Sequence, residues 1–146
     1  MKHKKITWRQ YDSFVSTLAS KLKASKAENI YGIPRNGLVL AVHLSHKLGK
    51  PLITDPKKIT KKTLVVDTIS HTGKQLNALA AKVKTDTAVL HLHAGSRHAP
   101  TSFVERPRAD EWLVYPWETV ASAHTSNSDL DDHRRHLMRM NAMRRR

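Results

Sequence analysis

The sequence predicts an α/β protein, a mostly parallel twisted sheet flanked by helices. Two similar units follow each other along the chain. Each has a short apolar run, a turn that contains glycine, and a stretch of apolar residues at helical spacing. A further apolar run follows the second unit. Neighbouring parallel strands need crossover connections, which helices provide, so this order favours a parallel sheet. The 146 residues suit one domain with a substantial core.

A helix is expected before the first unit. Thr7 and Gln10 have the spacing of a capping box, in which each side chain bonds the backbone of the other residue. Apolar residues then recur every three or four positions as far as Leu22. This spacing places Trp8 and Tyr11 on one helical face, and we expect both in the core.

The first unit begins with a short apolar run at residues 29–33, which suits a buried strand. A turn at residues 34–37 ends it. Residues 38–48 are apolar at helical period, and Gly49 supplies the usual chemistry of a helix end.

The second unit follows another short apolar run and a basic hairpin or loop that reaches residue 62. Nothing polar interrupts the next run before Asp67, so it is expected to be a fully buried strand. The predicted elements are a strand at 63–67, a turn at 68–73, a helix at 74–83 and a strand at 87–93.

The C-terminal part divides at about residue 120. Beyond Gly95 the chain is expected to be irregular and basic up to Arg108, and residues 111–118 form an aromatic-rich last strand or extended segment. We therefore predict a domain at residues 1–120. Residues 121–146 are then a polar linker (122–128) and a basic helix or tail, whose acids precede its arginines as the helix dipole favours.

Composition limits the function classes. Lys and Arg exceed Asp and Glu by 26 to 12, a net charge of +14, so the partners should be anionic. The absence of cysteine excludes a disulfide scaffold, a thiol nucleophile and thiolate zinc sites. No run of 18 apolar residues occurs, so we expect a soluble, cytoplasmic protein without a membrane partner.

Both turns follow strands at the sheet edge where ligands of parallel sheets bind. After Asp67, small hydroxyl residues and a glycine lead into a helix, so backbone N–H groups can converge on a phosphate. Asp67 is placed to accept hydrogen bonds from sugar hydroxyls or to hold a divalent cation. The turn at residues 34–37 offers a second anion site. The alternative is an ordinary helix start with a capping acid.

Three segments carry a family resemblance. Residues 30–41 resemble the pyrophosphate loop of type I phosphoribosyltransferases, and residues 64–75 resemble the ribose-5-phosphate signature of that family. Residues 112–118 are similar to the aromatic segment and Pro-Trp-acid of the bacterial xanthine-guanine branch. The segments occur in the family's order, so the resemblance points to the purine (xanthine-guanine/hypoxanthine) branch.

The resemblance implies transfer of a phosphoribosyl group from phosphoribosyl pyrophosphate (PRPP) to a 6-oxopurine, with release of pyrophosphate, as in purine salvage. It implies Mg²⁺ bound with PRPP at Asp67, and a homo-oligomer, a dimer or tetramer. Asp67, His71 and Arg35 would be catalytic. The residues expected to bind PRPP are Arg35, Asn36, Gly37, Asp67, Thr68, Ser70, His71, Thr72, Gly73, Lys74 and Gln75, and those expected to bind the base of the substrate or of a nucleoside monophosphate are His93, Trp112 and Leu113.

Several residues depart from the family pattern. Thr68 replaces the second signature acid, which weakens a magnesium site. His71 replaces the third acid and can still accept a proton near neutral pH. Asn36 replaces a glycine, and His93 replaces the lysine that bonds the exocyclic oxygen of the base. The flexible loop that closes over the reacting centre in the family is short or missing.

Two other interpretations remain. A catalytically impaired relative would bind a nucleotide, or nucleic acid through the arginines of the tail, as a regulatory or RNA-binding module. Histidines could also suggest zinc, with His91 and His93 on one strand face and His71 and His98 on nearby loops. With ten histidines in the chain such spacings arise by chance, and no zinc is expected.

Overall fold

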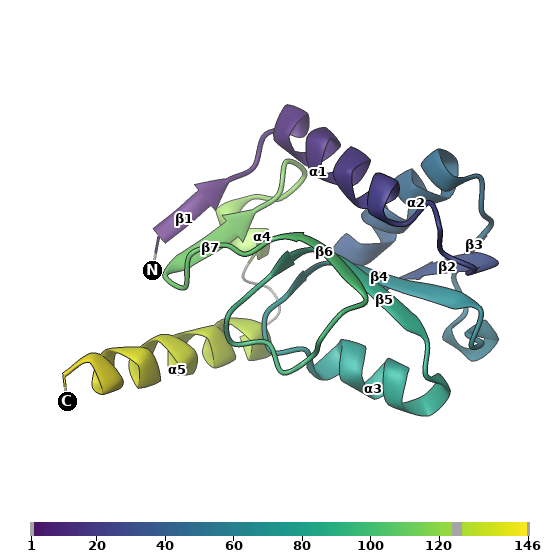
Figure 1. Cartoon of the computed structure of the whole chain (residues 1–146). Helices are drawn as coiled ribbons and strands as arrows, with labels where there is room; N and C mark the ends of the chain where they lie inside the picture. The colour runs from purple at the N-terminus through teal and green to yellow at the C-terminus, as the bar shows by residue number, and fades with distance from the viewer. Residues whose placement is uncertain (1, 124–126, 146) are drawn as a thin grey trace.

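A computed structural model describes residues 2–123 and 127–145 (Figure 1). The strands are β1 (Lys2–Lys5), β2 (Asn29–Gly32), β3 (Leu52–Ile53), β4 (Thr63–Ser70), β5 (Asp86–Leu92), β6 (Ser102–Glu105) and β7 (Glu111–Val114). The helices are α1 (Trp8–Lys21), α2 (Asn36–Leu48), the 3₁₀ turn η1 (Pro56–Lys58), α3 (Lys74–Val83), α4 (Val120–Ala123) and α5 (Asn127–Arg144). None of the helices in these ranges is long and apolar enough to cross a membrane.

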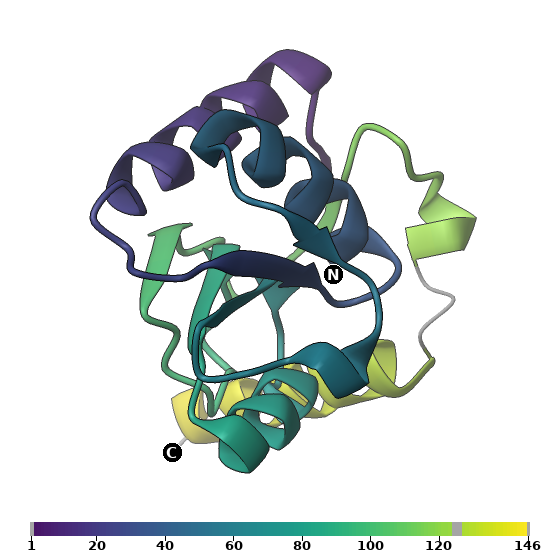
Figure 2. The ribbon, with the colours of Figure 1, turned by 90° about the vertical axis from the view of Figure 1, so that its right-hand side faces the viewer.

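The main sheet has five strands in the order β3-β2-β4-β5-β6, and all of its pairs are parallel. Alternate residues of β4 point to opposite faces: Leu64 and Val66 join one apolar cluster and Val65 joins another. The first cluster lies under α1 and α2, and the second lies under α3. Figure 2 shows these two layers on either side of the sheet. The predicted α/β class is therefore confirmed.

The expected helix signals are present. Thr7 and Gln10 form the capping box that begins α1, with Thr7 Oγ1 accepting the Gln10 amide at 3.1 Å. Gly49 ends α2 in the left-handed conformation, with φ 64°. Tyr11 is buried, but the prediction for Trp8 was wrong: its side chain is 57% exposed and lies at the rim of an aromatic cluster with Tyr11 and Trp117.

A second, two-stranded sheet was not predicted. β1 pairs with β7 in parallel, with Lys2 opposite Glu111, and Figure 1 shows the pair at one end of the molecule. The four residues of β1 are Lys-His-Lys-Lys, and all of them are exposed. Their sequence has no alternation of apolar and polar residues, which is the pattern that predicts a strand.

Three boundaries differ from expectation. β4 continues to Ser70, where a turn was predicted from residue 68, because its pairing with β5 extends to Leu92. β6 forms within the segment expected to be irregular, as a short edge strand beside β5. The linker at 122–128 is partly helical, since α4 and α5 occupy both of its ends, and residues 124–126 lie outside the described residues.

Candidate functional site

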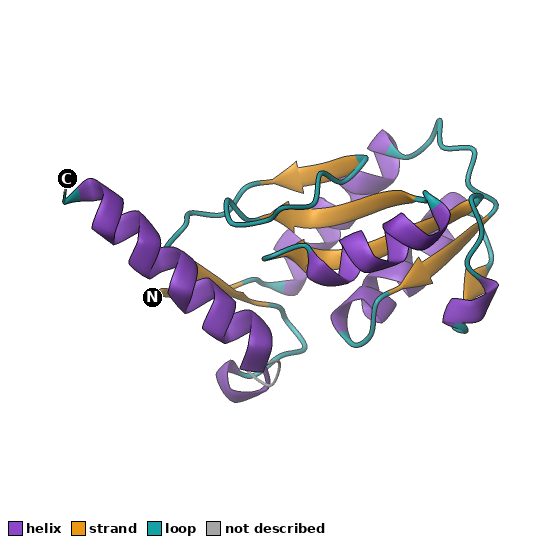
Figure 3. Cartoon of the chain, turned by 90° about the horizontal axis from the view of Figure 1, so that it is seen from below, coloured by secondary structure: helices purple, strands orange, loops and turns teal. Residues whose placement is uncertain are grey.

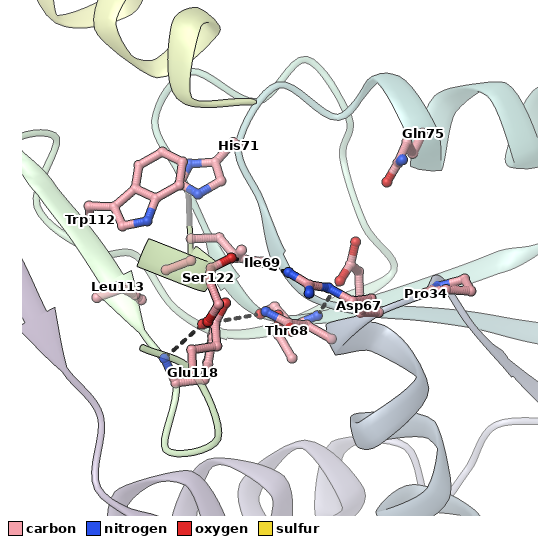
Figure 4. Close-up of a pocket in the computed structure, with 14 residues that line it drawn as sticks. Pro34, Asp67, Thr68, Ile69, His71, Gln75, Trp112, Leu113, Glu118 and Ser122 are labelled. Carbon is pink, nitrogen blue, oxygen red and sulfur yellow. Dashed lines mark hydrogen bonds between the residues drawn. The ribbon is translucent and has the colours of Figure 1, made fainter. Parts of the chain in front are cut away.

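The largest grouping of predicted site residues lies where β2 and β4 end (Figure 4). One cavity there is lined by residues from both turns and from β7, among them Arg35, Asp67, His71 and Trp112. A smaller cavity adjoins it around the start of α3, lined by residues 67 and 69–76. Asp67, Ile69, His71 and Gln75 line both cavities. The structure thus brings the predicted sugar, phosphate and base residues to one edge of the sheet.

The smaller cavity is the predicted phosphate cup. Thr72 and Gly73 turn the chain from β4 into α3, and Gly73 adopts φ 79°, which favours glycine. Lys74 and Gln75 begin α3, so the positive end of the helix dipole faces this cavity. Backbone N–H groups and the helix start can therefore bind an anion here.

Residues 93–97, which follow β5, pack against the phosphate cup and form hydrogen bonds with it. The amide of His93 donates to the Ser70 carbonyl at 3.0 Å, and the Arg97 amide donates to the Thr72 carbonyl at 2.9 Å. Ser70 Oγ lies 2.7 Å from Ser96 Oγ, and Ser70 is only 2% exposed. The Ser70 hydroxyl thus bonds Ser96 in this structure, while Ser70 lines the smaller cavity, and its expected contact with phosphate stays a prediction.

The other turn carries Arg35 close to the cavity. Its peptide bond with Pro34 is cis. Arg35 is exposed, and its Nη2 donates to the Ser122 carbonyl at 3.1 Å. Gly37 is needed for close packing, because a Cβ there would lie 2.7 Å from the Val66 carbonyl oxygen and 3.3 Å from Asp67 Oδ1. The glycine therefore lets the turn approach the carboxylate of Asp67.

The side chain of Asn36 is hydrogen-bonded within the protein. Its Oδ1 accepts a hydrogen bond from the indole N–H of Trp117 at 3.0 Å. The side chain therefore connects the turn to the aromatic cluster, and Asn36 also lines the main cavity, so its expected role toward pyrophosphate stays a prediction.

Asp67 and Thr68 are polar residues in the second half of β4. Asp67 Oδ1 accepts the Thr68 amide at 2.8 Å, and the half-buried Asp67 lines both cavities. Thr68 is fully buried, and its hydroxyl has no hydrogen-bond partner among the described residues. Its carbonyl accepts the Tyr115 hydroxyl at 3.1 Å.

The side of the cavity where the base was expected is formed by β7. Trp112 and Leu113 are buried there, with 3% and 5% of their surfaces exposed. The imidazole of His71 stacks on the Trp112 indole, with ring centroids 4.5 Å apart and planes inclined by 12°. Figure 4 shows the two rings side by side at the edge of the cavity. The expected stacking position of a base on Trp112 is therefore taken by a side chain of the protein.

His93 has the contacts of a buried structural histidine. It is 2% exposed, its Nδ1 accepts the Gly95 amide at 3.1 Å, and its Nε2 lies 3.3 Å from the Ala109 carbonyl. The ring is 5.3 Å from that of His71, but His93 is not among the residues that line either cavity. Backbone partners therefore engage both ring nitrogens in this structure, and the expected contact of His93 with the base stays a prediction.

Six residues that line the cavity were not predicted as site residues: Pro34, Ile69, Tyr115, Glu118, Ser122 and Ala123. Ile69 lies two positions after Asp67 in β4, so strand alternation could have indicated it. Pro34 belongs to the predicted turn at residues 34–37, and the remaining four depend on how the chain after β7 folds back. Ser122 and Ala123 lie beyond the predicted domain boundary at residue 120.

In the ranges that the structure describes, no three His, Asp or Glu side chains cluster tightly enough to hold a metal ion alone. Two carboxylates, Asp67 and Glu118, line the main cavity. One or two carboxylates together with substrate phosphates are the usual environment of Mg²⁺. The donor set thus fits a magnesium ion that arrives with a diphosphate ligand.

The fold and the site together define an α/β protein whose parallel sheet carries a turn suited to anions after one strand and an arginine turn after its neighbour. Solved structures agree with this class. A purine phosphoribosyltransferase from Pyrococcus horikoshii Ot3 is 30% identical, with a TM-score of 0.70 over 82% of this chain and 96% of that chain. The xanthine-guanine-hypoxanthine phosphoribosyltransferase of Helicobacter pylori is 21% identical, with a TM-score of 0.68, and the match covers 85% of this chain and 99% of that chain.

A hypothetical protein from Neisseria gonorrhoeae with bound ppGpp is also similar, 19% identical with a TM-score of 0.65 over 92% and 94% of the two chains. No protein-family model and no curated protein matches the sequence. On the structural similarities, the chain belongs to the type I phosphoribosyltransferase family and resembles its purine branch.

Proposed function

We propose that this protein transfers the phosphoribosyl group of PRPP to a 6-oxopurine and releases pyrophosphate. The observation that carries the proposal is the pair of adjoining cavities, which share Asp67 and His71 and together join the phosphate cup to Arg35 and Trp112. A sugar with a 5′-phosphate in the cup would have its hydroxyls near Asp67. Its anomeric carbon would then face the main cavity, between the arginine turn and β7.

In the reaction a ring nitrogen of the base forms a bond to the anomeric carbon while the bond from that carbon to pyrophosphate breaks. Arg35 lines the cavity and would stabilise the leaving pyrophosphate by its positive charge. The nitrogen must lose its proton, and the imidazole of His71, which lines the same cavity, would accept it. Magnesium, held with PRPP by Asp67 and Glu118, would supply further neutralisation of the diphosphate charge.

The test is product formation from PRPP and magnesium with guanine, xanthine, hypoxanthine or adenine, followed by chromatography. The expected result is nucleotide from at least one 6-oxopurine, with kcat/KM reduced about a hundredfold or more in Asp67→Asn and in Arg35→Ala. Asp12→Asn and Arg9→Ala make the same charge changes at exposed positions of α1 and should retain activity.

A specific alternative would be revealed by the same assay. If no base is converted while the protein still binds GMP or RNA, the chain is a non-catalytic member of its family that binds nucleotide or nucleic acid. Turnover of adenine alone would keep the transferase and overturn the 6-oxopurine preference.

A further inference from the structure

A third cavity lies beside the phosphate cup and takes no part in the proposed transfer. Its volume is about 290 Å³, and four cationic side chains line it: Lys74, Arg97, Arg135 and Arg139. Figure 3, which views the molecule from below, shows α5, which carries the last two, to the left of the main sheet. No carboxylate is among the described residues that line this groove. We call it the basic groove.

Separate elements place these charges. Lys74 is the first residue of α3. Arg97 belongs to the segment behind the cup, and its amide is fixed to the Thr72 carbonyl at 2.9 Å. Arg135 and Arg139 are four residues apart on α5, so they share one helical face, and both are exposed. The groove thus draws positive charge from three parts of the chain.

The basic groove is continuous with the cup. Thr72 and Lys74 line both cavities, so anionic groups bound in them would be close neighbours. In a nucleoside polyphosphate the phosphates are bonded directly through shared oxygens, whereas in RNA a ribose separates each phosphate from the next. The shared walls therefore favour a polyphosphate chain over a nucleic acid strand. Arginine forks also match phosphate oxygens in geometry as well as charge.

We propose that the basic groove binds the outer phosphates of a nucleoside 5′-diphosphate or 5′-triphosphate whose first phosphate occupies the cup. The inference rests on the proposed function only in assigning the cup to a 5′-phosphate. Because PRPP needs the same cup, such a nucleotide competes with PRPP. Nucleoside di- and triphosphates are then inhibitors of the transferase and bind more tightly than the monophosphate product.

The experiment measures dissociation constants by calorimetry for GMP, GDP, GTP and inorganic tripolyphosphate at physiological ionic strength. The wild-type protein should bind GDP and GTP about tenfold more tightly than GMP, in keeping with added charge-assisted hydrogen bonds. The double variant Arg135→Gln/Arg139→Gln should bind GMP as the wild type does and lose the preference for GDP. It should also bind tripolyphosphate more weakly.

The matched control is Arg144→Gln/Arg145→Gln, which removes the same charge from exposed positions at the end of α5 and should keep the preference. Equal affinities for GMP and GDP in the wild type would overturn the proposal, as would equal losses in the two double variants, which would indicate general charge attraction. A groove variant that loses affinity for a short single-stranded RNA but keeps the GDP preference would also overturn it.

The outcomes separate this inference from the proposed transfer. If no base is converted but the preference for GDP depends on Arg135 and Arg139, the basic groove stands and the transferase assignment fails. If nucleotide is formed but GDP binds no better than GMP, the transferase assignment stands and the proposal for the basic groove fails.

Discussion

The imidazole of His71 lies flat against the indole of Trp112, with 4.5 Å between the ring centroids. Trp112 is only 3% exposed, so little of its ring face remains for a ligand. A base that stacks on Trp112 has to displace the imidazole first. His71 also lies in the turn that forms the phosphate cup. The same side chain therefore contacts Trp112 and lines the cavity at the start of α3, which is the basis of the first prediction.

The first prediction is that His71→Ala has opposite effects on binding and chemistry. Removing the imidazole frees the Trp112 face, and aromatic pairs contribute about 0.5–1.5 kcal/mol, so the KM for the base should fall about two- to tenfold. Loss of the proton acceptor should lower kcat about a hundredfold. Steady-state kinetics with saturating PRPP and varied base measure both. A raised base KM with unchanged kcat would contradict the displacement and the proton-acceptor role together.

The second prediction compares two glycines with left-handed backbones. Gly73 has φ 79° and Gly49 has φ 64°, so alanine is strained at both, at a cost of about 1–2 kcal/mol. A Cβ at Gly73 would also lie 2.5 Å from the Cβ of His98, whereas nothing lies within 4 Å of one at Gly49. Gly73→Ala should therefore lower the free energy of unfolding more than Gly49→Ala.

The matched pair also separates stability from ligand binding. Gly73→Ala should weaken GMP binding, because the cup must shift away from His98, and Gly49→Ala should leave it unchanged. Urea unfolding and calorimetry provide the two readouts. Equal losses of stability in the two variants would mean that the clash at His98 relaxes without cost.

The existence of the two turns could be predicted because glycine and charged residues directly follow apolar runs. Such a signal depends only on neighbouring residues in the sequence. The sequence could not predict β1, since four exposed residues, Lys2–Lys5, have no apolar face, and their strand form depends on pairing with β7. The hydrogen-bond partners of His93 could not be predicted either, because they are the backbone groups of Gly95 and Ala109, which lie in loops. The stack of His71 on Trp112 joins two segments that only the tertiary fold brings together.

The third prediction concerns acid stability. His91 is fully buried, with Nδ1 2.8 Å from the Tyr115 hydroxyl and Nε2 3.2 Å from Glu105 Oε1. Burial, and then the charge of Lys4, lower its pKa from 6.5 to about 4. Between these values the unfolded chain binds more protons than the folded one, so stability is complete above pH 6.5 and falls as the pH drops toward 4. The loss should reach about 3 kcal/mol.

Urea unfolding at a series of pH values from 7 to about 4 tests this prediction. His91→Asn should be less stable at pH 7, with a flatter dependence on pH. The exposed His46 of α2 supplies the control, since His46→Gln should keep the slope of the wild type. If the free energy of unfolding of His91→Asn depends on pH as steeply as that of the wild type, groups other than His91 cause the acid sensitivity.

The fourth prediction concerns Thr68, the residue that stands where the family pattern has a second acid. Its hydroxyl is buried without a hydrogen-bond partner among the described residues, which is unfavourable, and valine has nearly the same shape. Thr68→Val should therefore raise the free energy of unfolding by about 1 kcal/mol. Because the side chain is fully buried, the KM for PRPP should stay within about twofold of the wild-type value. Thr68→Asp should instead destabilise the fold by burying a carboxylate beside that of Asp67. A Thr68→Val variant that unfolds as readily as the wild type but binds PRPP much more weakly would mean that the hydroxyl turns toward the substrate and replaces the missing acid.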